Sequence, residues 1–166
     1  MANRADVPPP MGYLLWHVSL RWRVAMDRIL APLGLTHAQY AVVASLHAMT
    51  AGGLRPSQRQ LAEYSGLEPM YISRLVRVLE RAGLVERADN PDDPRAVQLA
   101  LTPRGSDVVA KAVPEVRKLE ERYLVPLGGR DSVRNVELRR ALQTLLAHAD
   151  ALGGTPAPTA FGQAAG

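Results

Sequence analysis

Residues 67–87 read LEPMYISRLVRVLERAGLVER, and this stretch decides the fold. On a helical wheel of about 100° per residue, one face of the stretch is apolar and the opposite face is largely basic. The apolar face carries Ile72, Leu75, Val76 and Leu79, and the opposite face carries Met70, Arg74, Arg77 and Arg81. Glu68 and Pro69 suit a helix start, and Gly83 suits its end. The pattern predicts an amphipathic helix with its arginines facing outward.

A second, shorter helix is predicted directly before this one, within RPSQRQLAEYSG. Ser57 followed three residues later by Gln60 forms a capping box, so the helix should run from about residue 58 to 65 and close at Gly66. Two short helices joined by a tight turn that contains glycine are typical of a helix-turn-helix.

A β-hairpin is predicted directly behind the helix-turn-helix. The segments LVERA and AVQLAL have strand patterns, and DNPDDPR between them reads as a turn-rich tip with two prolines. A hairpin in this position is a wing, so a winged helix-turn-helix is expected over about residues 36–101.

Longer helices flank this unit. Apolar residues recur at steps of four and three from Met11 to Ile29, and Pro32 and Gly34 should end that helix. Thr36 should cap the next helix, with Gly52-Gly53 as its stop. Thr102-Pro103 opens another long helix that Gly128-Gly129 breaks, and a last helix begins near Ser132. The apolar seams exceed what one small winged domain can cover, which predicts a helical dimer interface.

The predicted fold is therefore mainly α with a small β-hairpin wing: a winged helix-turn-helix with N- and C-terminal dimerisation helices at about 11–31 and 103–152. We expect one domain over residues 11–152. The tails at 1–10 and 153–166 are rich in Pro, Gly and small residues, and we expect them to be disordered.

Composition narrows the function. The 166 residues carry a formal charge of +4, with 18 arginines, two lysines and no cysteine. The basic balance permits an anionic partner. No apolar run reaches the roughly 18 residues needed to span a bilayer, so we expect a soluble, cytoplasmic protein without a membrane partner. The sequence lacks a phosphate loop, a nucleophile elbow and a dinucleotide fingerprint, so we expect neither an enzyme nor a cofactor.

The basic helix face suits the DNA major groove, where a recognition helix presents its N-terminal residues to base edges. The start of the preceding helix suits a phosphate, and the wing suits the minor groove. The predicted DNA-binding residues are Ser57, Gln58, Arg59, Met70, Tyr71, Ser73, Arg74, Arg77 and Arg95.

Four of these residues, and Arg81 on the same helix face, also have a plainer interpretation. Arg74 and Arg77 would lie on a solvated face that Glu80 partly compensates, and Arg81 would complement the helix dipole. Ser57 would be a cap alone, and Arg95 would pair with Asp92 or Asp93 at the wing tip.

Taken in order, these segments resemble the MarR family of bacterial winged helix-turn-helix regulators. The resemblance covers LGLTHAQYAVVASL, QLAEYSGLEPMYISRLVRVLERAGLVER and DPRAVQLALTPRG. It implies an obligate homodimer, formed by the first and last helices, that binds a pseudo-palindromic double-stranded DNA operator. The common Asp-Arg-Arg pattern of the family wing matches Asp93 and Arg95, whereas Pro94 replaces the middle arginine.

The resemblance also implies a repressor that a small aromatic or phenolic ligand relieves. The positions comparable to the family's effector pocket are Trp16, His17, Leu20, Arg21, His37 and Tyr40. Packing is the alternative role for Trp16 and Leu20. The four histidines are scattered, which argues against metal sensing. A winged-helix module that binds protein instead of DNA is the alternative function, and Met70, Tyr71 and Val78 lean slightly towards it.

Overall fold

The computed structural model describes residues 8–51, 54–90 and 93–152. The fold is mainly helical with one two-stranded antiparallel hairpin, as predicted. In chain order the elements are α1 (Met11–Leu30), η1 (Ala31–Leu33), α2 (His37–Ala51), α3 (Gln58–Ser65), α4 (Pro69–Arg81), β1 (Val85–Asn90), β2 (Asp93–Leu101), α5 (Pro103–Leu124), η2 (Val125–Leu127) and α6 (Val133–Ala151).

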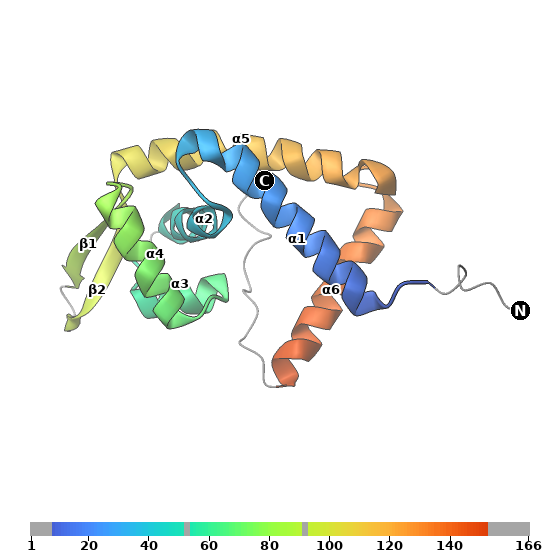
Figure 1. Ribbon diagram of the computed structural model, residues 1–166. Helices are drawn as coiled ribbons and strands as arrows, with labels where there is room; N and C mark the ends of the chain where they lie inside the picture. Colours follow the sequence, from blue (N-terminus) through green and yellow to red (C-terminus); the bar gives the residue numbers. More distant parts are fainter. Residues whose placement is uncertain (1–7, 52–53, 91–92, 153–166) are drawn as a thin grey trace, which may run out of the picture.

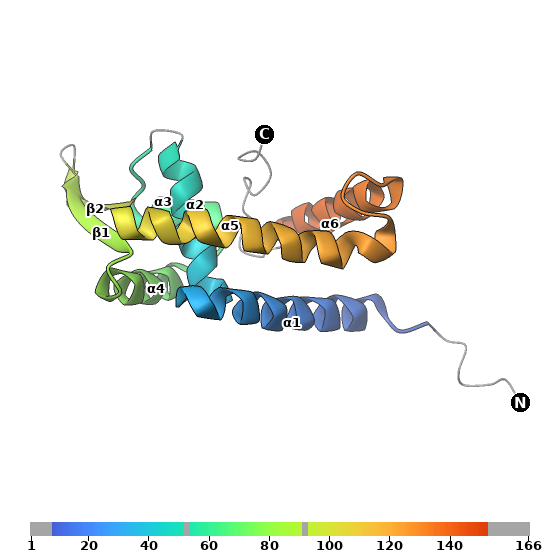
Figure 2. The ribbon, with the colours of Figure 1, turned by 90° about the horizontal axis from the view of Figure 1, so that it is seen from above.

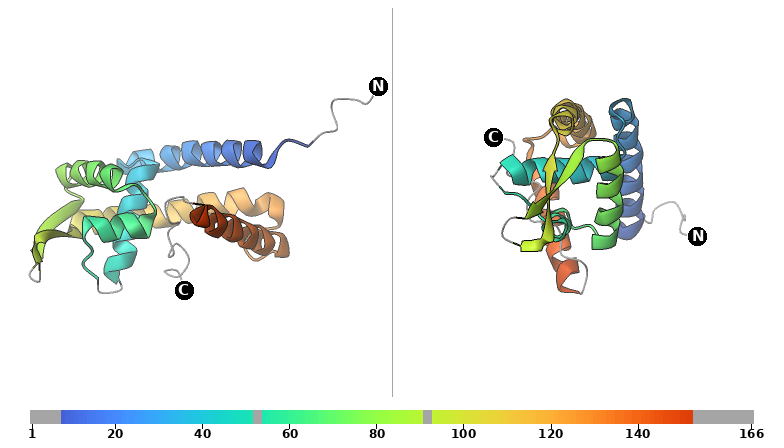
Figure 3. Two further views of the ribbon diagram at one scale, coloured as in Figure 1. Left: turned by 90° about the horizontal axis from the view of Figure 1, so that it is seen from below. Right: turned by 90° about the vertical axis from the view of Figure 1, so that its left-hand side faces the viewer.

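The elements form a lobe and an extension (Figure 1). The lobe contains α2, α3, α4 and the hairpin, with the hairpin at its outer end. From the lobe, α5 runs beside α1, as Figure 2 shows, and α6 folds back from the far end of α5. The end-on view in Figure 3 places α4 and the hairpin together at the tip of the lobe.

One hydrophobic core joins the lobe to the end of α1 and to α5, as far as Leu119. It includes the whole predicted apolar face of α4, with Ile72 and Val76 fully buried. Burying one such aliphatic side chain contributes about 1.5–3 kcal/mol. The same packing turns the opposite face of α4 to solvent.

Local capping signals set the helix ends of the lobe. Ser57 and Gln60 form the predicted capping box at the start of α3, and Gly66 closes that helix with a φ of 66°. At the start of α4 the carboxylate of Glu68 accepts hydrogen bonds from the amides of Met70 and Tyr71. Gly52-Gly53, the expected stop of α2, lie outside the described residues.

The hairpin is longer than the sequence indicated. The segment 89–95 was expected to be a tip, yet β1 continues to Asn90 and β2 begins at Asp93. The strands pair with a register shift between Asp89 and Asn90. The predicted extent of the tip was wrong because Pro94 lies in the register irregularity, between the paired positions Asp93 and Val97, where a strand tolerates proline.

The extension carries apolar side chains that the described residues leave exposed. Of the described side chains in α6, only Asn135 is buried. The large apolar residues that stay exposed on α1 and α6 are Met11, Tyr13, Leu14, Leu15, Trp16, Val18, Val24, Val133, Val136, Leu138, Leu142, Leu145 and Leu146.

Among the described residues, no single helix is both long and apolar enough to cross a bilayer. Residues Met11–Leu33 and His37–Ala51 pass that length and composition test only as a pair bent by 73°.

Candidate nucleic-acid interface

The outward face of α4 carries exposed basic side chains. Arg74 and Arg77 are exposed, as are Met70 and Tyr71, whereas Ser73 is half-buried. Within the described part of the chain, neither guanidinium has an ion-pair or hydrogen-bond partner. Two unpaired arginines therefore project from a helix that its buried face holds in place.

Glu80 does not pair with Arg74 or Arg77, as the plainer interpretation of those arginines would require. It pairs with Arg87 of β1, at 3.0 Å between Arg87 Nε and Glu80 Oε2. The Arg87 N–H is not aligned with the carboxylate, so the contact is an ion pair rather than a hydrogen bond. Sequence reasoning missed Arg87 because the contact depends on how the hairpin packs against α4. The pair links the helix to the wing and leaves Arg74 and Arg77 uncompensated.

Arg81 differs from the other two arginines. Its Nε donates a hydrogen bond to the main-chain oxygen of Arg77, at 3.2 Å. A cation bound to a carbonyl in the last turn complements the negative end of the helix dipole. The plainer interpretation of Arg81 thus has a contact to support it.

The start of α3 is fixed against the wing. The Leu99 amide of β2 donates to the Pro56 oxygen at 2.8 Å, and Ser57 forms an isolated antiparallel bridge with Gln98. Ser57 and Gln58 are half-buried, and Ser57 caps the helix. Arg59 is exposed and pairs with Glu63 at 2.9 Å. This ion pair lies on the surface and is therefore weak, so Arg59 can exchange it for another anion.

The wing contributes backbone but no described side chain at its tip. Arg95 lies in β2, next to Pro94. Its side chain, and the alternative ion pair to Asp92 or Asp93, lie outside the described part of the structure.

The six predicted effector residues form two groups in the single chain. Trp16, His17, Leu20 and Arg21 lie on α1, where Trp16 is 64% exposed and the His17 ring lies 4.1 Å from that of Tyr13. His37 and Tyr40 are half-buried in the first turn of α2. These two groups are separated along the axis of α1.

A hydrogen bond from the His37 backbone to α1 holds the start of α2, with His37 and Tyr40, near Asp27. The His37 amide donates to Asp27 Oδ1 at 2.7 Å. Asp27 follows His17 by ten residues, or about 15 Å along a helix. Burial lowers the pKa of His37, Asp27 opposes that shift and Arg23 adds to it. Burial also raises the pKa of Tyr40, so both side chains favour the neutral form at neutral pH.

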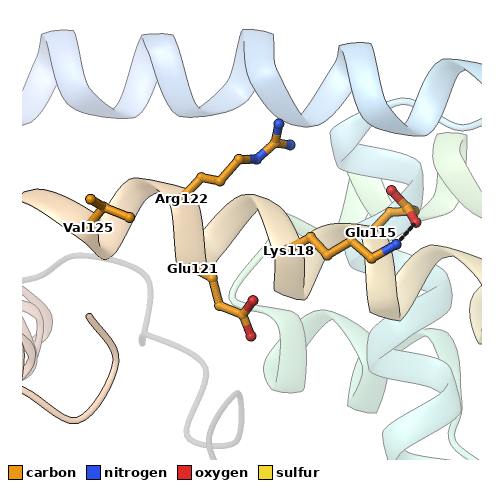
Figure 4. Close-up of a pocket in the computed structure, with 5 residues that line it drawn as sticks. All are labelled: Glu115, Lys118, Glu121, Arg122 and Val125. Atoms are coloured by element: carbon orange, nitrogen blue, oxygen red, sulfur yellow. Dashed lines mark hydrogen bonds and ion pairs between the residues drawn. The ribbon is translucent and has the colours of Figure 1, made fainter. Parts of the chain in front are cut away.

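A surface hollow of about 490 Å³ lies elsewhere, along α5 (Figure 4). Its lining residues are Glu115, Lys118, Glu121, Arg122 and Val125. Lys118 pairs with Glu115 at 2.7 Å, and the Arg122 side chain extends towards α1. None of the six predicted effector residues lines this hollow. Among the described residues, no three His, Asp or Glu side chains gather as a metal site.

Comparison with known proteins adds three findings. The sequence model of the MarR family matches residues 35–97. The uncharacterized HTH-type transcriptional regulator YdcH of Bacillus subtilis is 34% identical over 137 residues, which cover 82% of this chain and 90% of YdcH. The HTH-type transcriptional repressor Rv2887 of Mycobacterium tuberculosis is 31% identical over 136 residues, 82% of this chain and 93% of the repressor.

A solved structure agrees with these sequence relatives. The M. tuberculosis transcriptional regulator MosR, crystallised in complex with DNA, has a TM-score of 0.71 to this chain and is 26% identical to it. The match covers 87% of this chain and 98% of MosR.

Proposed function

Since the chain belongs to the MarR family of transcriptional regulators, which bind DNA and are not enzymes, we propose that it is a homodimeric, sequence-specific repressor released from its operator by a small molecule. The observation that carries the proposal is the outward face of α4. Its arginines lack partners within the described chain, and DNA offers both guanine edges and phosphates to them.

Each part of the interface has a role in this proposal. On α4, Arg74 pairs with a guanine, Arg77 approaches a phosphate, and Met70, Tyr71 and Ser73 face base edges. At the start of α3, Ser57, Gln58 and Arg59 contact the backbone of the duplex. Arg95 on the wing enters the minor groove, where a narrow groove attracts arginine.

The dimer is supported by the uncovered apolar face of the extension. Exposed leucines such as Leu138, Leu142 and Leu145 recur along α6, and α1 exposes Leu14, Leu15 and Val18. A patch of this extent on a single chain marks an association surface. In a two-fold dimer the two α4 helices would enter successive major grooves about 34 Å apart, so the operator is an inverted repeat.

Repression and its relief are the finer parts of the proposal. Rv2887 is named a repressor, and this chain aligns with 93% of it. We place the effector where a second subunit would cover α1, so that Trp16, His17, Leu20 and Arg21 form one wall and His37 and Tyr40 the other. A ligand acts there by favouring a dimer geometry in which the α4 helices no longer match successive grooves.

Selection of bound duplexes from a random pool tests the function. We expect an inverted repeat whose half-site centres lie about 10 base pairs apart. The logarithm of the binding constant should fall with the logarithm of salt concentration, by about 0.9 for each phosphate neutralised. A pool that shows no enrichment at low salt would refute the proposal. Enrichment of a single, unrepeated half-site would refute the dimer.

A further inference from the structure

We propose that Met70 and Tyr71, in the first turn of α4, recognise thymine methyl groups one or two base pairs from the guanine that pairs with Arg74. The inference rests on the proposed function, in which α4 is the recognition helix. It names the base chemistry that the operator must offer to this turn.

The first turn of α4 has no amide left to offer to DNA. Pro69 has no N–H, and the Met70 and Tyr71 amides donate to Glu68 Oε1 and Oε2 at 3.0 and 2.9 Å. The Ile72 amide donates to the Glu68 main-chain oxygen at 3.0 Å. A helix start usually attracts phosphate through such amides. Here a carboxylate already occupies them, and its charge repels a phosphate.

Met70 and Tyr71 expose largely apolar side chains on this turn, whereas Ile72 is buried. Met70 is 62% exposed and Tyr71 is 42% exposed. A thioether has little hydrogen-bonding capacity, so Met70 gains from DNA mainly by covering apolar surface. The apolar group that base pairs present in the major groove is the C5 methyl of thymine. The occupant that fits this turn is therefore a thymine methyl.

The spacing along α4 places the guanine nearby. Arg74 follows Met70 by four residues and Tyr71 by three, so the three side chains share one side of the helix. Three to four residues rise about 4.5–6 Å along a helix. Base pairs are about 3.4 Å apart, which corresponds to one or two steps. Each half-site should thus combine a thymine with a guanine on the neighbouring or next base pair.

Deoxyuridine is the probe, because it pairs like thymidine but lacks the methyl group. On the operator recovered by selection, each thymine of a half-site is replaced by uracil in turn. We expect one replacement to weaken wild-type binding about fourfold, and the symmetric pair about fifteenfold, from the value of one buried methyl group. Replacements outside the contacted steps should have no effect.

Variants assign the contact to its side chain. Met70→Ala and Tyr71→Ala are tested against each operator in which a uracil weakens wild-type binding. The variant that lacks the contacting side chain should bind the thymine and the uracil forms of that operator equally well. Val78→Ala is the matched control. Val78 is also exposed on α4, but it lies eight residues, or about 12 Å along the helix, beyond Met70. It should keep the full sensitivity to uracil. Since all three side chains are exposed, circular dichroism should show unchanged folding.

The outcomes separate the two proposals. If wild-type protein tolerates uracil at every half-site thymine while Arg74→Ala still loses its guanine preference, the methyl contact is refuted and the recognition helix stands. If every uracil replacement that weakens wild-type binding also weakens the binding of Met70→Ala and of Tyr71→Ala by the same factor, the assignment to this turn is refuted. If no DNA is enriched, the proposed function fails, and this inference fails with it.

Discussion

Gly105, the third residue of α5, lies against the backbone of Leu84, where the chain leaves α4 for the wing. A Cβ at this position would overlap the Leu84 carbonyl group. Because the obstacle is backbone rather than a flexible side chain, the start of α5 must move to admit it. We predict that Gly105→Ala destabilises the fold, although alanine normally favours a helix.

The contacts at this junction give the magnitude. Overpacking in a close-packed site costs about 1–3 kcal/mol. Moving α5 also strains two hydrogen bonds, from Thr102 Oγ1 to the Gly83 oxygen at 2.7 Å and from the Thr102 amide to the Leu84 oxygen at 3.1 Å. Each is worth about 1 kcal/mol. Alanine returns at most about 1 kcal/mol of helix propensity. The net loss is about 3 kcal/mol, or about 6–12 °C in Tm for a chain of this size.

Thermal unfolding followed by circular dichroism, at matched protomer concentration, measures the effect. Gly12→Ala is the control, because Gly12 lies in the first turn of α1 and a Cβ there meets nothing within 4 Å. The control should raise the free energy of unfolding by up to about 1 kcal/mol. Glycine-to-alanine substitution should therefore lower the free energy of unfolding at position 105 and raise it at position 12. A Gly105→Ala protein as stable as wild type would refute the reasoning.

Three further predictions concern the interface, His37 and the extension. Arg77→Ala should reduce the salt slope of operator binding by about 0.9 per half-site, whereas Arg81→Ala, whose guanidinium is bound to backbone, should not; equal slopes would contradict this. Burial lowers the pKa of His37 in the folded state, so as pH falls the unfolded state takes up the proton first. The free energy of unfolding of wild type should therefore fall relative to that of His37→Gln below about pH 6.5. Urea denaturation that gives the same pH dependence for both proteins would contradict this. Leu145→Asp should yield a folded monomer in sedimentation velocity, and an intact dimer would exclude α6 from the interface.

The helix ends were predictable because their signals are local. A capping box and a glycine with positive φ act within a few residues, so Ser57, Gln60 and Gly66 could be placed from sequence alone. The orientation of α4 was predictable for a related reason. Its apolar face fixes which side is buried, and the arginines then have to face solvent.

The missed features depend on contacts between distant segments. Helical spacing gives Glu80 only local partners, whereas its actual partner, Arg87, comes from the packing of β1 on α4. The close approach of Gly105 to Leu84 likewise exists only once α5 is docked. The two strands are longer than predicted because backbone pairing does not require strand-forming side chains at every position. The predicted effector residues fall into two groups because they lie on two different helices, α1 and α2, and their role stays a prediction.

Selection of bound DNA by wild-type and Arg74→Ala protein, side by side, tests the central claim that α4 reads the operator. Wild type should recover an inverted repeat with a fixed guanine in each half-site. Arg74→Ala should recover the same repeat with that guanine relaxed, since one arginine–guanine pair contributes about 1–3 kcal/mol of discrimination. If Arg74→Ala recovers the same motif with the guanine preference intact, α4 does not read the operator through Arg74, and the account is wrong at its centre.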